Sequence, residues 1–221
     1  MFMWICMDIG MDTDALLCTM RKLREGELRK TVDARMAGFA AIGRKGRKEE
    51  LFSELCFCLL TANYSAEGGI RVQKAVGSGF LALPEKELAK KLKALGYRFP
   101  NVRAGFIAQA RRHISFLPEV LRMPSMEARL WLVKNVKGLG LKEASHFLRN
   151  VGATDLAIID FHIVDVLERH GMMKKPRGRT LSPKMYIEAE KALRDLAGKL
   201  RMNLGELDLY LWFCETGKVL K

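Results

Sequence analysis

Most long segments of the chain place apolar residues three and four positions apart, the spacing of one face of an α-helix. In residues 48–62, for example, Leu51, Leu55 and Leu59 recur at every fourth position. Period-two alternation, which predicts a half-buried strand, is sustained nowhere, and the single β-like run, residues 156–159, is short. The pattern therefore predicts an all-α fold of about nine or ten helices. The expected helices cover residues 12–30, 48–62, 84–95, 102–117, 125–136, 141–152, 160–171, 182–200 and 203–217.

The ends of several expected helices carry capping residues. Asp12 or Thr13 can cap the first helix, because a short side-chain oxygen accepts hydrogen bonds from the unpaired amides there. Gly152, Gly171 and Gly217 each follow an apolar-periodic segment, where a helix commonly ends in a left-handed residue. These signals agree with the boundaries that the apolar pattern sets.

The charge of the chain indicates its partner. The 221 residues include 38 Lys and Arg against 25 Asp and Glu, a formal net charge of +13. This excess calls for a polyanion, with nucleic acid the first interpretation and an anionic membrane surface the second. No segment has the roughly 20 consecutive apolar residues of a membrane span, and none pairs a basic face with a strong apolar face. We therefore expect a nucleic-acid partner and no membrane, and the charge favours a monomer.

Five cysteines, an odd number, lie mostly in apolar contexts, as Cys56 and Cys58 do. Reduced thiols in an intracellular protein are favoured over a disulfide framework. The cysteine spacing matches neither a zinc site nor a four-cysteine iron–sulfur pattern, so we expect no metal and no other cofactor. The apolar start, residues 1–11, is short and lacks a preceding basic region, so it does not predict a signal peptide.

Residues 136–144, VKGLGLKEA, interrupt the helical pattern with two glycines one residue apart. Gly138 and Gly140 can adopt positive φ without steric cost, and Leu139 between them can enter the core. Without side chains at the glycines, the amides of the loop and of the next helix's first turn are accessible to a phosphate oxygen. The sequence thus predicts a helix–hairpin–helix that grips a DNA backbone without reading bases. The alternative is that the glycines merely end one helix and allow the next.

Lys142 lies on the first turn of the next helix, where its charge opposes the helix dipole. It is either a further phosphate contact or a nucleophile that the helix N-terminus and neighbouring positive charge help to deprotonate. A nucleophile needs a carboxylate nearby, and Asp160 stands at an N-cap position directly after four apolar residues. His162 follows in the first turn of that helix. Taken singly, Asp160 can be a plain cap and His162 a surface residue.

The run VKGLGLKEASHFLRNVGATDLAIIDFHIVDVL, residues 136–167, resembles the signature of the helix–hairpin–helix, Gly/Pro/Asp DNA glycosylase superfamily. Within it, the chain is most similar to the archaeal type-2 8-oxoguanine DNA glycosylase/AP lyases. The spacing of Lys142 and Asp160 and the chain's last residues, LYLWFCETGKVLK, agree with that family. The similarity covers residues 15–221. One departure is Ile158, where the wider superfamily commonly has proline.

The resemblance implies a role for each matching residue. Lys142 would attack C1′ of the damaged nucleotide and form a Schiff base that permits β-elimination, and Asp160 would stabilise positive charge on the sugar. Gly138 and Gly140 would hold a phosphate. The remaining implied contacts are with DNA or the flipped base: His162 near a phosphate, Asn63 in the gap left by the base, Phe99 stacked on the base, Arg103 at the opposite strand, Trp212 against the base, and Lys221 closing over the lesion pocket.

Alternatives to several of these roles stay open from the residues alone. Phe99 and Trp212 can be core aromatics, and Asn63 can be an ordinary residue at a helix end. The basic runs 111–113 and 174–179 can extend the phosphate-binding face or be simply solvated.

Two helical lobes are expected, with an active-site cleft between them. One is the continuous stretch 48–150, which carries the hairpin, and the other combines residues 1–47 with 151–221. The implied reaction is removal of 8-oxoguanine from double-stranded DNA, followed by nicking 3′ to the lesion; abasic DNA is also a substrate. The implied location is the nucleoid-associated cytoplasm of a prokaryote, with an archaeon suspected. A related glycosylase for another lesion and a non-catalytic helix–hairpin–helix module remain alternatives.

Overall fold

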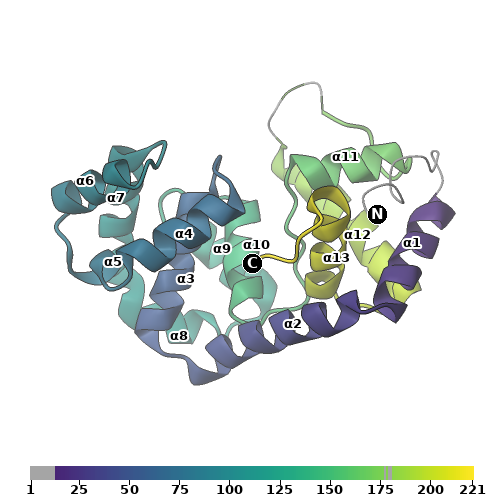
Figure 1. Cartoon of the computed structure of the whole chain (residues 1–221), viewed down its shortest axis with the longest axis horizontal. Coiled ribbons are helices and arrows are strands. Elements are labelled where there is room, and N and C mark those ends of the chain that lie inside the picture. Colours follow the sequence, from purple (N-terminus) through teal and green to yellow (C-terminus); the bar gives the residue numbers. More distant parts are fainter. Residues whose placement is uncertain (1–12, 177, 179–180) are drawn as a thin grey trace. The chain divides into compact units, whose positions relative to one another are not determined.

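The computed structural model describes residues 13–176, 178 and 181–221. Every regular element within these residues is a helix and none is a strand, which confirms the all-α prediction (Figure 1). The elements in chain order are α1 (Thr13–Glu25), α2 (Leu28–Lys45), α3 (Lys48–Thr61), α4 (Ala66–Val76), α5 (Gly79–Ala82), α6 (Glu85–Ala94), α7 (Pro100–Ala110), the 3₁₀ helix η1 (Arg111–Phe116), α8 (Leu117–Val120), α9 (Ser125–Asn135), α10 (Leu141–Asn150), α11 (Phe161–Arg169), α12 (Pro183–Leu200) and α13 (Leu204–Thr216).

Some sequence predictions fall outside the described residues. The apolar start of the chain, the cap Asp12, and Arg177 and Arg179 of the basic run 174–179 are among them. The other predicted cap, Thr13, is instead the first residue of α1, and its hydroxyl donates to the His170 carbonyl at 3.3 Å. The capping prediction for Thr13 was therefore wrong.

The apolar pattern missed the helices with weak or interrupted periodicity. Helix α4 contains two adjacent glycines, which lower helix propensity, yet Ser65 caps it by accepting from the Gly68 amide at 3.1 Å. A Cβ on Gly69 would lie 2.7 Å from Thr61 Cγ2, so this glycine lets α4 pack closely against α3. Most of α2 and the four-residue α5 were also not predicted.

The expected helix over residues 102–117 is divided into α7, η1 and α8. Arg111 stands where α7 ends, and its guanidinium donates to the carbonyls of Phe80 at 2.8 Å and Leu83 at 2.6 Å. These distant hydrogen bonds fix the chain where the helix tightens, and local periodicity contains no information about them.

The β-like run 156–159 is extended but pairs with no strand in the described part of the chain. Its backbone is satisfied by side chains of α12 instead. Tyr186 donates to the Ala157 carbonyl at 2.7 Å, and Glu190 accepts from the Ala157 amide at 2.9 Å. A buried extended segment needs hydrogen-bond partners, and here two helical side chains take the place of a sheet.

The chain divides into two compact units. The first combines Met1–Gly38 with Thr154–Leu220, and the second combines Phe39–Ala153 with Lys221. Helix α2 runs through the boundary between Gly38 and Phe39.

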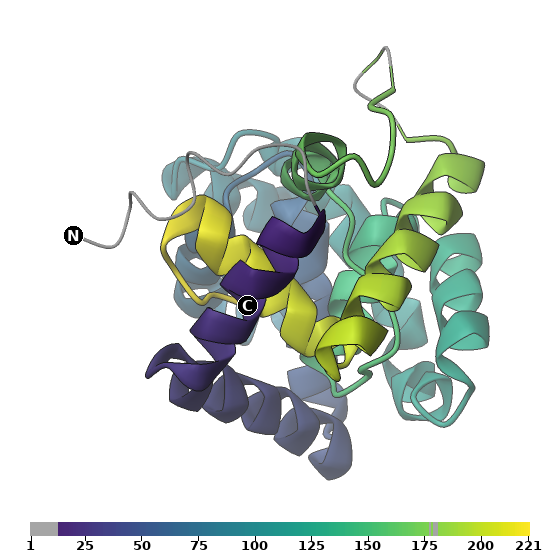
Figure 2. The same ribbon diagram turned by 90° about the vertical axis from the view of Figure 1, so that its right-hand side faces the viewer.

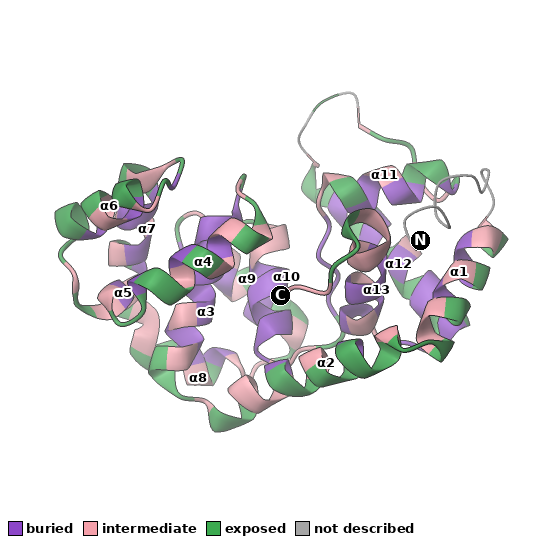
Figure 3. Cartoon of the chain, viewed as in Figure 1, coloured by how far each residue is buried: buried purple, intermediate pink, exposed green. Residues whose placement is uncertain are grey.

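The second unit is built around α3. From Leu51 to Thr61 all but one of its residues are buried, so this helix is buried on all sides rather than on the single face that was expected. It contacts α4, α7, α8, α10 and η1, and burial is concentrated on α3 and α10 in Figure 3. The hairpin helix α10 is therefore fixed against the most buried element of its unit.

In the first unit, α1, α12 and α13 pack against one another, and α11 packs against α13 (Figure 2). Ser182 caps α12 by accepting from Met185 at 3.2 Å, and Asn203 caps α13 through a reciprocal capping box with Glu206. Gly152, Gly171 and Gly217 all have positive φ at the ends of their helices, as predicted; Gly217 directly follows α13, and one residue separates each of the others from its helix. No helix in the described ranges has the length and apolar character needed to cross a bilayer.

Candidate active site

The loop between α9 and α10 is a helix–hairpin–helix. Leu139 is 6 % exposed and enters the core, as predicted. Gly138 has φ of 95°, and a Cβ there would lie 2.3 Å from Cδ2 of Phe106, so both backbone and space require glycine. Gly140 does not use the positive φ open to it: its φ of −97° and ψ of −171° are extended values that any residue can adopt. Positive φ is thus needed at Gly138 alone.

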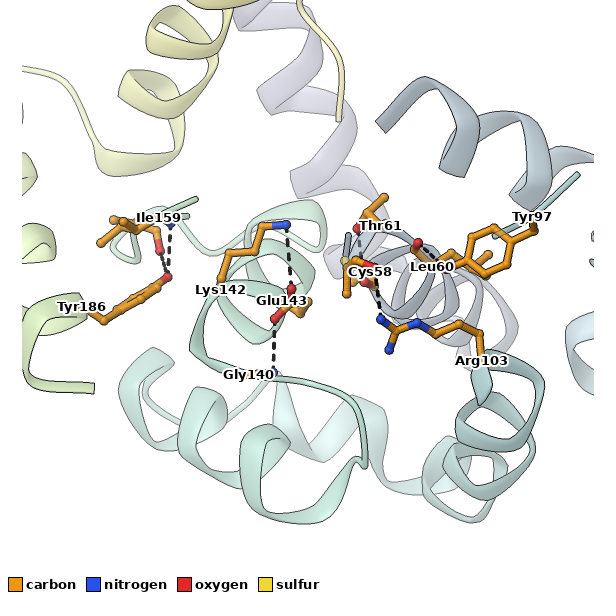
Figure 4. Close-up of polar contacts among 12 residues, drawn as sticks. Cys58, Leu60, Thr61, Tyr97, Arg103, Gly140, Lys142, Glu143, Ile159 and Tyr186 are labelled. Atoms are coloured by element: carbon orange, nitrogen blue, oxygen red, sulfur yellow. Dashed lines mark hydrogen bonds and ion pairs between the residues drawn. The ribbon is translucent and has the colours of Figure 1, made fainter. Parts of the chain in front are cut away.

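The N-terminus of α10 presents amides that have no partner within the helix, as every helix start does. One neighbouring amide is already satisfied, because the Gly140 N–H donates to Glu143 Oε2 at 3.2 Å (Figure 4). A Cβ on Gly140 would lie 3.2 Å from that same oxygen, so glycine gives this carboxylate room. The hairpin therefore combines accessible amides with a built-in carboxylate.

Lys142 lies on the first turn of α10, with its side chain 24 % exposed and its Nζ 3.8 Å from Glu143 Oε1. Glu143 is thus the carboxylate that accompanies Lys142 within the second unit. Glu143 was not predicted from the sequence, although a Glu at the third position of a helix is a known capping signal. One carboxylate both caps α10 and pairs with the lysine.

Asp160, in the first unit, is the N-cap of α11, and its Oδ1 accepts from the Ile163 amide at 3.1 Å. The predicted capping role is confirmed. His162 is exposed two residues later, and its ring lies edge-on to Trp212 with 5.6 Å between ring centroids. Trp212 is only half-buried, so it is not simply a core aromatic. The fold thus brings together a histidine and a tryptophan from α11 and α13.

Asn63 directly follows α3 and is exposed, with φ of 61°. Three hydrogen bonds hold the helix end that leads to it (Figure 4). Tyr97 Oη donates to Leu60 O at 2.7 Å, Arg103 Nη2 donates to Ala62 O at 3.0 Å, and Thr61 Oγ1 donates to Cys58 O at 3.1 Å. The turn therefore presents Asn63 in one fixed left-handed conformation.

Arg103 is 8 % exposed, so in this structure its side chain supports the turn before Asn63. A direct contact of Arg103 with the opposite strand stays a prediction. Phe99 is half-buried at the N-cap position of α7, and Arg98 Cζ lies 5.0 Å from the centre of its ring. Arg98 is exposed and was not singled out from the sequence, where it is one of many basic residues.

Lys221 is held inside the second unit. Its Nζ donates to Glu54 Oε1 at 2.6 Å and lies 4.6 Å from the centre of the Phe57 ring. Glu54 was also missed, although an acidic residue among the apolar residues of 48–62 was a visible signal. The base-binding role of Lys221 remains a prediction.

The face of α10 that packs against α3 is buried, and its titratable groups are shifted by that burial. Burial lowers the pKa of His146 well below its usual range, and Arg149 and Lys142 lower it further. Burial raises the pKa of the Cys58 thiol, as does Glu54. Near neutral pH His146 is thus uncharged and Cys58 a thiol. The described residues contain no group of three or more His, Cys, Asp or Glu side chains arranged to hold a metal ion.

Comparison with known proteins gives one consistent picture. The family model described as 8-oxoguanine DNA glycosylase matches residues 32–202. An 8-oxoguanine DNA glycosylase/AP lyase of Korarchaeum cryptofilum is 47% identical over 213 residues, covering 96% of this chain and 100% of that protein. The crystal structure of the Methanocaldococcus jannaschii 8-oxoguanine DNA glycosylase is similar, with a TM-score of 0.89, 47% identity, and coverage of 93% of this chain and 96% of that one. The M. jannaschii enzyme in complex with a 15mer DNA containing 8-oxoguanine matches with the same TM-score and identity, covering 93% of this chain and 99% of that one.

Proposed function

The chain belongs to the 8-oxoguanine DNA glycosylase family, and we propose that it is a bifunctional 8-oxoguanine DNA glycosylase and AP lyase of base-excision repair. Its substrate is double-stranded DNA that carries 8-oxoguanine or an abasic site. It works on the chromosome, within the nucleoid of a prokaryotic cell. The observation that carries the proposal is Lys142 on the first turn of the hairpin helix, the same turn whose amides are suited to a phosphate.

The hairpin fixes the DNA backbone. The amides at the N-terminus of α10 favour an anion, and Gly138 lets the loop turn tightly beside the Phe106 ring just before them. His162, exposed at the start of α11, contacts a second phosphate. Since the net charge is +13, much of the affinity comes from released counterions and falls steeply with salt.

Lys142 is the nucleophile. Its neutral amine attacks C1′, a C1′–N bond forms, and the glycosidic bond breaks with its electron pair leaving on the base, which is then protonated. The nitrogen then loses a proton, and its lone pair expels O4′, which takes up a proton as the sugar ring opens to a Schiff base. The Schiff base acidifies the 2′ hydrogens, so loss of one proton expels the 3′ phosphate by β-elimination. The pairing of Lys142 with Glu143 holds the side chain at the helix start before reaction.

Asp160 stabilises the positive charge that develops on the sugar. Its carboxylate is oriented by the hydrogen bond from the Ile163 amide, so no rotamer freedom is lost during reaction. Asp160 therefore has two roles: it caps α11 and it stabilises the charge on the sugar.

The damaged base must leave the helix stack to be reached, at a cost of a few kcal/mol. Stacking on aromatic side chains, worth about 1–3 kcal/mol per base, offsets this cost. Phe99 and Trp212, both half-buried, are the platforms, Asn63 fills the vacated space and Lys221 closes over the base. Arg103 contacts the opposite strand or, through Ala62, keeps Asn63 in place.

Borohydride trapping tests the proposal. The wild-type protein and Lys142→Gln are incubated with duplexes that contain 8-oxoguanine, an abasic site or normal guanine. We expect a trapped covalent complex with the first two duplexes for the wild type and none for the variant. A complex that survives in Lys142→Gln would remove Lys142 from its role. Binding without trapping or cleavage on any duplex would indicate a non-catalytic module, and trapping only with another damaged base would indicate a different lesion.

A further inference from the structure

Glu54 is an acidic residue buried on the most apolar helix of the second unit, with only 6 % of its surface exposed. Both of its carboxylate oxygens are engaged. Oε1 accepts from Lys221 Nζ at 2.6 Å and from Gln73 Nε2 at 3.1 Å, and Oε2 accepts from Asn150 Nδ2 at 3.0 Å. Donors from α4, α10 and Lys221 therefore converge on one carboxylate.

The Lys221 ammonium is fixed from two directions. Glu54 holds it by a short charge-assisted hydrogen bond, and the face of the Phe57 ring lies beneath it at 4.6 Å. Phe57 is itself held edge-on by the buried His146 ring, with 5.5 Å between centroids. The side chains of Lys221 and Glu54 are only 16 % and 8 % exposed. A lysine side chain, normally one of the most mobile, thus has a single defined position.

Stability alone does not account for this arrangement. Removing two charges from water costs about as much as their attraction returns, so an apolar pair would fill the same space equally well. Buried ionic groups are instead suited to fixing one geometry.

We propose that Glu54 is a positioning residue that sets where Lys221 meets the flipped base, and that selection of 8-oxoguanine therefore depends on Glu54. Gln73 and Asn150 orient the carboxylate, and Phe57 supports the ammonium from below. This inference rests on the proposed function, specifically on contact between Lys221 and the base. If it is correct, loss of Glu54 slows excision of the base but does not slow nicking of abasic DNA, in which no base is present.

The experiment compares single-turnover base excision from an 8-oxoguanine duplex with strand nicking of an abasic duplex. The variants are Glu54→Gln, Lys221→Met and the double variant. The control is Glu87→Gln, which breaks the exposed Lys90–Glu87 pair of α6, whose side chains are 75 % and 51 % exposed. We expect Glu54→Gln and Lys221→Met each to slow excision about tenfold or more while abasic nicking stays within about twofold. The double variant should be no slower than the worse single variant, because both remove one interaction.

Each other result overturns the inference in a distinguishable way. Normal excision by Glu54→Gln beside slow excision by Lys221→Met leaves the role of Lys221 intact and removes Glu54. Normal excision by Lys221→Met removes the premise that Lys221 meets the base. Equal loss of excision and nicking shows that Glu54 is merely structural, and absence of excision by the wild type refutes the proposed function itself. If Glu54→Gln does not fold, Gln73→Met takes its place. We expect this variant to lose some excision activity, less than Glu54→Gln would, and to keep its nicking activity. An unchanged ratio of excision rate to nicking rate would count against the inference.

Discussion

The guanidinium of Arg103 donates a 3.0 Å hydrogen bond to the backbone carbonyl of Ala62, a residue 41 positions earlier in the chain and directly before Asn63. Replacing Arg103 with Met leaves this carbonyl without the charged donor while keeping the apolar stem. We expect the free energy of unfolding to fall by about 1–3 kcal/mol, measured by urea denaturation. Arg98→Met, at an exposed neighbouring position, is the matched control and should change stability by less than about 0.5 kcal/mol. Equal stability of the two variants would show that the bond to Ala62 does not hold the turn.

Asn63 has φ of 61°, which glycine adopts without strain and alanine does not. Asn63→Gly therefore removes the side chain and keeps the turn, so stability should stay within about 0.5 kcal/mol, whereas Asn63→Ala should lose about 1 kcal/mol. Both variants should excise 8-oxoguanine from duplex DNA more slowly, by roughly tenfold if the side chain contributes one good contact. Full activity of Asn63→Gly would show that the Asn63 side chain has no role in excision and is an ordinary residue at a helix end.

Gly138 and Gly140 are predicted to respond differently to alanine. At Gly138 a Cβ meets the Phe106 ring at 2.3 Å and φ is 95°, so Gly138→Ala should lose about 1–3 kcal/mol of stability and bind duplex DNA more weakly. At Gly140 the backbone is extended and the nearest atom is the flexible end of Glu143 at 3.2 Å, so the stability loss should be smaller. Thermal unfolding and fluorescence anisotropy with an undamaged duplex measure both effects. Similar losses at the two positions would contradict the assigned geometry.

Asp160 can be tested separately as a cap and as a charge. Asn caps helices as well as Asp, so Asp160→Asn should keep stability within about 0.5 kcal/mol, whereas Asp160→Ala should lose about 1 kcal/mol. Both should lower base excision by about 10²-fold or more if the charge acts on the sugar. An Asp160→Asn enzyme with normal excision would restrict this residue to its capping role.

Stability should fall in acid because His146 is buried as a neutral ring. Its pKa in the folded protein lies well below the ordinary value of 6.5, mainly through burial and then through Arg149 and Lys142. The unfolded state therefore binds a proton that the folded state does not, and the contribution is lost as pH falls below about 6.5, by up to about 1.4 kcal/mol per pH unit. Urea denaturation of the wild type and His146→Leu between pH 7.5 and about pH 5 measures the difference. Parallel pH profiles for the two proteins would contradict the assignment.

Local signals in the sequence predicted most helices and the hairpin. Apolar residues at helical spacing predicted α3, α9 and α10, because such a pattern needs only neighbours one turn away. Glycines that interrupt this pattern predicted the turn at Gly138, and an aspartate after an apolar run predicted the cap at Asp160. The same local reasoning missed α4, where Gly69 is explained by close packing on α3 and Gly68 by the Tyr64 ring beside it.

Tertiary structure alone decided which polar groups meet. The pairs Glu54–Lys221 and Arg103–Ala62 join residues 167 and 41 positions apart, and no periodicity or spacing relates such partners. It also decided that Arg103 is buried, that Trp212 is half-buried beside His162, and that Gly140 needs no positive φ. The reason is physical: a helix forms from interactions between residues a turn apart, whereas a buried charge is placed only when distant helices close around it and must supply its hydrogen bonds. Local sequence patterns therefore predicted most of the helices and the reactive side chains on them, and packing determined which groups hold those side chains in place.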